Sequence, residues 1–173
     1  ARRVLDLKTD DFIYLFIGNI QKYKGVQGLV DTYLSSKMKK SYLLVAGKCI
    51  DPVIDRKLRQ TSANGSISYI NQLIPDNELQ IYLNASDVVV YPFNKITTSG
   101  SVMLALSFGK PIIYPRLGSL NELPSNLGWS YDYNDRNGLL NTLKLAMLEK
   151  EKTITMGANA FKYARKNNWY DIS

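Results

Sequence analysis

The feature that most constrains this fold is a regular alternation of short apolar runs with segments of helical period. The run Phe12–Ile17 consists of β-branched, leucine and aromatic residues and stops at Gly18, which is typical of a strand buried on both faces. Residues 25–37 then repeat apolar side chains at three- and four-residue spacing, which predicts a helix with one apolar stripe. Strands that alternate with helices imply right-handed crossovers and a parallel sheet. The sequence therefore predicts a doubly wound α/β domain.

The same alternation continues along the chain without an internal repeat or linker. Further strands are expected at residues 42–46, 66–70, 88–91, 112–114 and 129–131. Further helices are expected at residues 51–63, 75–83, 97–108, 135–149 and 152–167. A length of 173 residues fits one domain of this class.

Composition excludes several kinds of chemistry. The chain has no His, so Ser-His-Asp, Cys-His and His-based zinc sites are excluded within it. The single Cys49 has no partner for an internal disulfide, which fits a reducing compartment. No signal peptide and no apolar run near the roughly 20 residues of a membrane span are visible, so a soluble, cytoplasmic chain is expected. A net charge of +7 favours an anionic partner without choosing among nucleotides, nucleic acid and membranes.

The loop after the first strand is one candidate anion site. Gly18 allows a sharp turn and close approach of a ligand to the backbone. Lys24 precedes the next helix, whose free N–H groups also attract anions. A glycine turn with solvated lysines is an equally good reading of these residues. The loop is not a dinucleotide fingerprint, because Ile20 and Tyr23 stand where that motif needs glycine.

The loop after the fourth strand is the second candidate. Thr98, Ser99, Gly100 and Ser101 bring hydroxyl groups and unpaired backbone amides to the start of the expected helix at 97–108. An ordinary N-cap would use the same residue types. Both loops follow strands of one parallel sheet, whose carboxyl ends form the usual ligand-binding edge.

Four stretches in order resemble the C-terminal, donor-nucleotide-binding domain of GT-B glycosyltransferases of the retaining family 4 type, also described as glycosyl transferases group 1. They are the glycine-lysine loop at 16–25, the strand and glycine turn at 43–47, the block at 74–88, and the signature helix at 98–111. Gly118 and Glu122 stand where the family has a further glycine-rich loop. The likeness covers roughly residues 12–150.

The resemblance implies one Rossmann-like half of a two-domain enzyme that moves a sugar from a nucleotide-diphosphate sugar to an acceptor, with retention of configuration. Residues 1–11 would be the interdomain linker and the start of the domain, and residues 12–173 the nucleotide-sugar-binding domain, with the N-terminal acceptor domain outside this chain. Such an enzyme serves polysaccharide, glycolipid or glycoconjugate synthesis, and the isolated domain is expected to be inactive. No cofactor, metal or nucleic acid is expected, and the full enzyme would associate peripherally with the membrane.

The resemblance also implies roles for particular residues. The donor diphosphate would be bound by Gly18, Asn19 and Lys24, with Lys24 as the catalytic cation. The distal phosphate and the sugar would be held by Thr98, Ser99, Gly100 and Ser101. The base and ribose would be contacted by Asn71, Gln72, Leu73 and Leu104. Two departures stand out. Asn19 replaces the usual Arg, and Ile96 and Leu104 replace the two carboxylates of the E-x7-E motif.

The competing hypothesis is a non-catalytic basic α/β domain that binds nucleic acid or an anionic membrane surface. Its only support is the net charge of +7. The basic residues are spread over several predicted helices and come without an RNA-binding aromatic motif, as in a solvated surface.

Overall fold

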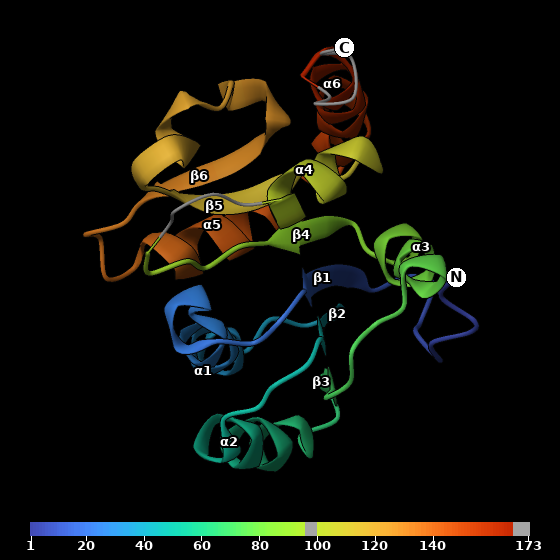
Figure 1. Ribbon diagram of the computed structural model, residues 1–173, viewed down its shortest axis with the longest axis vertical. Coiled ribbons are helices and arrows are strands. Elements are labelled where there is room, and N and C mark those ends of the chain that lie inside the picture. The colour runs from blue at the N-terminus through green and yellow to red at the C-terminus, as the bar shows by residue number, and fades with distance from the viewer. Residues whose placement is uncertain (96–99, 168–173) are drawn as a thin grey trace.

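The computed structural model describes residues 1–95 and 100–167 (Figure 1). Within them the strands form one fully parallel sheet in the order β3-β2-β1-β4-β5-β6. The strands are β1 (Phe12–Ile17), β2 (Ser41–Ala46), β3 (Ile67–Ile70), β4 (Val88–Val90), β5 (Ile112–Arg116) and β6 (Gly128–Asp132). The predicted doubly wound α/β fold is confirmed.

Helices cover both faces of this sheet. They are α1 (Val26–Ser36), α2 (Pro52–Ser62), α3 (Asp76–Ala85), α4 (Gly100–Ser107), α5 (Gly138–Leu148) and α6 (Lys152–Lys166), with short 3-10 turns η1 (Lys22–Lys24), η2 (Gly118–Glu122) and η3 (Ser125–Leu127). Helices α1, α2 and α5 lie on one side of the strands, and α3, α4 and α6 lie on the other (Figure 1).

The core lies on both faces of the central strands. Every residue of β1 and β4 is buried, as are most residues of β2. This explains why the three strands read as continuous apolar runs rather than as alternating ones. Each fully buried Val, Leu or Ile contributes about 1.5–3 kcal/mol, so the centre of the sheet is a rigid support for the loops that leave it.

Two predicted helix starts need comment. Helix α5 begins at Gly138 rather than at residue 135, because the side chains of Asp132 and Asp135 accept hydrogen bonds from the backbone N–H groups of Asn134 and Asn137. Such Asx turns compete with the first helical turn and delay it. The helix expected at 97–108 is observed as α4 from Gly100, and residues 96–99 lie outside the described ranges.

The first residues are tied to the amino-terminal edge of the sheet. The Arg2 guanidinium donates to the carbonyl oxygens of Thr9, Asp11 and Ala85 and forms an ion pair of 2.8 Å with Asp87. The Asp87 carboxylate also accepts from the N–H of Ile13 in β1. Residues 1–11 therefore pack on this domain; their role as an interdomain linker stays a prediction.

The strand order reverses beside β1. Strand β1 has β2 on one side and β4 on the other, and the chain leaves β1 toward β2 but later leaves β4 toward β5. Helices α1 and α4, which follow β1 and β4, therefore lie on opposite faces of the sheet. Parallel α/β sheets form their ligand crevice at the carboxyl edge between two such connections. The first candidate anion loop stands at this position, and so do Gly100 and Ser101 of the second.

Candidate functional site

The loops after β1 and β4 are locked together by backbone contact. Gly25 adopts a left-handed conformation with φ of 70°, and a Cβ there would lie 1.9 Å from the carbonyl oxygen of Pro92. The N–H of Asn94 donates to the carbonyl oxygen of Tyr23 at 2.8 Å. Only glycine combines an unstrained positive φ with the absence of a Cβ, so the structure requires glycine at position 25, directly after Lys24.

Lys24 is the charged residue that this arrangement sets apart. It ends η1 and is half-buried, and its Nζ lies 3.7 Å from the position that a Cβ on Gly18 would take. Burial lowers the pKa of its ammonium group, and no carboxylate in residues 1–95 or 100–167 pairs with it. A partly desolvated cation without an internal anion, beside a glycine loop, is suited to bind an anionic ligand.

Glycines let the loops after β1 and β2 touch. Gly18 has φ of 132°, and a Cβ on Gly47 would lie 1.8 Å from the Gly18 carbonyl oxygen. The N–H of Gly18 donates to the carbonyl of Ala46 at 3.1 Å. The next residue, Asn19, lies on the same loop as Lys24 and is exposed, so a ligand can reach its side chain.

The start of α4 presents backbone at the same edge. Gly100 is exposed, and no described atom lies within 4 Å of the Cβ position there. The hydroxyl of the fully buried Tyr91 donates to the carbonyl oxygen of Ser101, which ties the first turn of α4 to the end of β4. Leu104 is half-buried on α4. Thr98, Ser99 and Ile96 lie outside the described residues.

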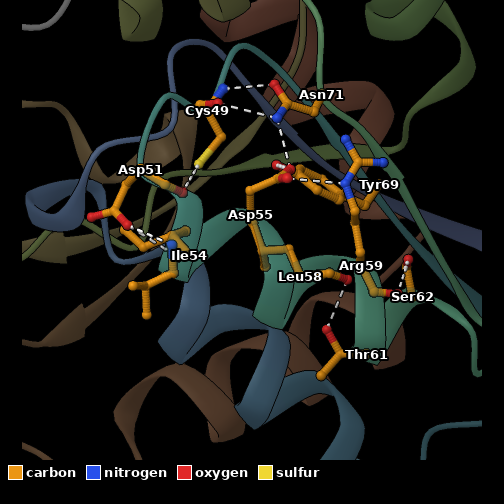
Figure 2. Close-up of polar contacts among 11 residues, drawn as sticks. Cys49, Asp51, Ile54, Asp55, Leu58, Arg59, Thr61, Ser62, Tyr69 and Asn71 are labelled. Carbon is orange, nitrogen blue, oxygen red and sulfur yellow. Dashed lines mark hydrogen bonds and ion pairs between the residues drawn. The ribbon is translucent and has the colours of Figure 1, made fainter.

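The loop after β3 combines exposed and internally bonded residues. Gln72 is exposed, and Leu73 retains 72% of its accessible surface, which is unusual for leucine. The Asn71 side chain instead bonds Cys49 and Asp55 (Figure 2). The resemblance assigned this loop to the base and ribose, and the sequence did not reveal the side-chain network behind it. The one local sign was Asp55 and Arg59 at helical i,i+4 spacing.

Hollows of the surface add little chemistry. One of about 170 Å³ lies beside η1 at the carboxyl edge, and two of about 500 and 510 Å³ lie at the opposite edge. In the second of the larger two, Arg2 and Asp87 already pair with each other.

Across the described ranges, no group of three His, Cys, Asp or Glu side chains gathers as metal ligands would. In the same ranges no helix is long and apolar enough to cross a bilayer.

Comparison with known families decides the class of protein. Residues 11–146 match the family model described as glycosyl transferases group 1. The chain belongs to this family. A relative of this glycosyltransferase chain, the GDP-mannose:glycolipid 4-beta-D-mannosyltransferase of Xanthomonas campestris pv. campestris, is 28% identical over 123 residues, which are 69% of this chain and 35% of that protein. The chain thus spans about a third of the length of that relative.

Solved structures agree on the fold of this glycosyltransferase chain. HepE of Anabaena, in complex with UDP-glucose, superposes with a TM-score of 0.80 at 18% identity, over 95% of this chain and 46% of that one. The C-terminal domain of a group 1 family protein (LpcC) of Francisella tularensis gives 0.75 at 17% identity, over 94% and 87%. At these identities the likeness shows the fold, which is one Rossmann-like half of a GT-B glycosyltransferase, as expected.

The structure therefore brings one group of the predicted site residues to the same edge of the sheet. Gly18, Asn19 and Lys24 lie on the loop after β1, Gly100 and Ser101 begin α4, and Asn71, Gln72 and Leu73 follow β3. The binding role assigned to each residue stays a prediction.

Proposed function

We propose that this chain is the donor-binding domain of a glycosyltransferase that uses a nucleotide-diphosphate sugar and retains the anomeric configuration. The observation that carries the proposal is Lys24, a half-buried cation with a lowered pKa and no carboxylate partner within the described residues. It stands at the switch point of the sheet, on a loop whose glycines bring backbone close to a ligand.

A nucleoside diphosphate fits this position chemically. Gly18 and Asn19 offer backbone and amide groups, Lys24 offers a positive charge, and the first turn of α4 at Gly100 and Ser101 offers the partial positive charge of a helix N-terminus. The electrostatic attraction between an anion and fixed donors or a partly desolvated cation is stronger than the same attraction in water.

In the reaction, the acceptor oxygen bonds to the anomeric carbon on the face from which the nucleoside diphosphate departs. The bond between sugar and diphosphate breaks, and the proton of the acceptor hydroxyl passes to the departing diphosphate. Negative charge develops on the departing diphosphate as its bond to the sugar breaks. Lys24 and the backbone dipoles of α4 are positioned in this proposal to stabilise that charge before it forms. This chain then supplies the donor half of catalysis, and the acceptor half lies on another domain.

Names of related proteins support the substrate class. HepE is described in complex with UDP and with UDP-glucose, and the Xanthomonas campestris relative is named for GDP-mannose and a glycolipid. We extend from these a nucleotide-sugar donor and a role in polysaccharide, glycolipid or glycoconjugate synthesis. Peripheral membrane association and a cytoplasmic location belong to the same proposal.

The proposal is tested by isothermal titration calorimetry of this chain with UDP, GDP and ADP, each paired with its nucleoside. One diphosphate should bind, and its nucleoside should bind at least tenfold more weakly, because the diphosphate makes the charge-assisted contacts. Absence of binding by all three diphosphates at millimolar concentration would refute the proposal. Salt-sensitive binding to DNA or to anionic vesicles without nucleotide binding would favour the basic-domain hypothesis instead.

A further inference from the structure

The Asn71 side chain continues the sheet beyond its last regular rung. The β2–β3 pairing ends at Ala46 and Ile70, and the Gly47 N–H donates to the Ile70 carbonyl at 3.0 Å. Two residues farther along, Asn71 Oδ1 accepts from the Cys49 N–H at 2.9 Å, and Asn71 Nδ2 donates to the Cys49 carbonyl at 3.1 Å. One side chain thus satisfies both backbone groups of Cys49 and joins the loops after β2 and β3 (Figure 2).

Cys49 is also connected to the loop that carries Lys24. Ile20 and Cys49 form an isolated parallel bridge, and the Ile20 N–H donates to the Lys48 carbonyl oxygen at 2.8 Å. Ile20 is buried, four residues before Lys24. Hydrogen bonds therefore join the loop after β1 (residues 18–25, here called the diphosphate loop after its proposed role) to Lys48, and they join the neighbouring Cys49 to Asn71.

Asp55 on α2 holds the far end of this chain of bonds. Its Oδ1 accepts from Asn71 Nδ2 at 2.7 Å and from the Tyr69 hydroxyl at 2.8 Å, and its Oδ2 accepts from Arg59 Nε at 3.0 Å (Figure 2). The Arg59 guanidinium also lies over the Tyr69 ring, 5.8 Å from its centroid. These bonds lower the pKa of the Asp55 carboxyl, and the bond from Arg59 has the largest effect, followed by those from Asn71 and Tyr69. Asp55 is therefore ionised at neutral pH.

The network is not the main attachment of α2 to the sheet. Helix α2 is already attached to the sheet by the buried side chains of Ile54 and Leu58. Asn71, Tyr69 and Asp55 are only partly buried, and the residues that follow, Gln72 and Leu73, are exposed. What the network does is order two loops at the ligand-binding edge, at the cost of their conformational freedom.

We infer that Asn71 and Asp55 are positioning residues that hold the loop after β3 in register with the diphosphate loop, so that base and diphosphate meet a preformed site. The inference rests on the proposed function. Preordered loops leave less conformational entropy to be lost on binding, so releasing them weakens affinity. The effect passes through Cys49 and Ile20 rather than through contact of Asp55 with the ligand.

The test is a double-mutant cycle with Asn71→Asp, Asp55→Asn and their combination. Asn71→Asp puts two carboxylates side by side and removes both amide donations, so the two loops separate. In the combined variant, the amide at position 55 donates to the carboxylate at 71, which still accepts from the Cys49 N–H. Asp31→Asn is the matched control. Asp31 lies on α1 and makes an exposed ion pair with Lys57, which lies on α2 as Asp55 does.

Two quantities are measured: the Kd for the nucleoside diphosphate that the wild-type chain binds, and hydrogen exchange of the Ile20 and Cys49 amides. We expect Asn71→Asp to weaken binding about tenfold and to speed exchange at both amides. Asp55→Asn should act in the same direction and less strongly. The combined variant should recover part of the affinity and of the protection, because only the Cys49 carbonyl still lacks its donor, and Asp31→Asn should change neither.

The failures are distinguishable. If the wild-type chain binds no nucleotide, the proposed function and this inference fall together. If it binds and Asn71→Asp leaves Kd unchanged, only the inference is overturned, and the network is structural. Loss of affinity without recovery in the combined variant also overturns it, because the two residues then do not act as a pair. Should Asn71→Asp fail to fold, Asp55→Asn with the exchange measurement decides the question in the same way.

Discussion

At the scale of single residues, the glycines around the switch point carry the most information. Gly18 and Lys24 were recognisable in the sequence because a turn glycine and a cation followed a buried strand. The reason for Gly25 was not, since the atom that excludes a side chain there belongs to Pro92. The same applies to Asn71, whose partners Cys49 and Asp55 are 22 and 16 residues away. Contacts of this kind depend on how loops meet in space, which local patterns do not encode.

Gly25→Ala should destabilise the chain by about 2–4 kcal/mol, because it combines left-handed backbone with a collision against the Pro92 carbonyl. Gly28→Ala is the control three residues later, inside α1, where no described atom outside the helix's own backbone lies within 4 Å of the added Cβ. It should stabilise by roughly 0.5–1 kcal/mol, as alanine does in a helix. Urea unfolding measures both. Equal effects of the two substitutions would show that the loops after β1 and β4 are not locked as described.

Lys24→Met should raise the stability of the unliganded chain at neutral pH. Burial lowers the pKa of Lys24 in the folded state, so the charged form is disfavoured there relative to the unfolded chain. The penalty is complete below the folded pKa and fades as pH rises toward the ordinary pKa of about 10.4. Thermal unfolding at pH 7 and pH 10 measures it: the gain from Lys24→Met should be larger at pH 7. A gain that grows with pH would contradict a desolvated cation.

At the scale of elements, strand and helix order followed from periodicity, and boundaries followed from caps. Asp51 and Pro52 mark the start of α2 in both sequence and structure, since the Asp51 carboxylate accepts from the N–H groups of Val53 and Ile54. Helix α5 began later than predicted because the Asx turns at Asp132 and Asp135 satisfy backbone donors outside a helix. The short turns η1, η2 and η3 had no periodic signal, because three to five residues are too few to show one.

The contact between α2 and β3 should make the chain sensitive to acid. The folded-state pKa of Asp55 is lowered by Arg59, Asn71 and Tyr69. Its contribution to stability is therefore complete above the unfolded pKa of about 3.9 and is lost as pH falls through the folded value. Urea unfolding at pH 7 and near pH 3 should show wild-type losing more stability than Asp55→Asn. An identical loss in the two proteins would show that the carboxylate has no favourable partners in the folded chain.

At the scale of the whole molecule, the absence of His from the sequence acquires a meaning under the proposed function. Catalytic classes that need His are excluded from this chain, and the proposed function leaves the acceptor half of the site to another domain. The fold and the family were predictable, because parallel α/β topology and ordered motifs determine them. The edge of the sheet at which we propose the site follows from the same topology. The preferred base and sugar could not be predicted, because such a preference depends on side-chain geometry in loops, which local patterns do not encode.

The most direct test of the central claim compares Lys24→Met with Lys22→Met in calorimetric titrations of the diphosphate that the chain binds. Both lysines lie in η1, but Lys22 is exposed and Lys24 is half-buried beside Gly18. Lys24→Met should weaken binding by about 10- to 100-fold, as loss of one charge-assisted contact does, and Lys22→Met by less than about threefold. Equal affinities for wild-type and Lys24→Met would contradict the assignment of this loop to the diphosphate.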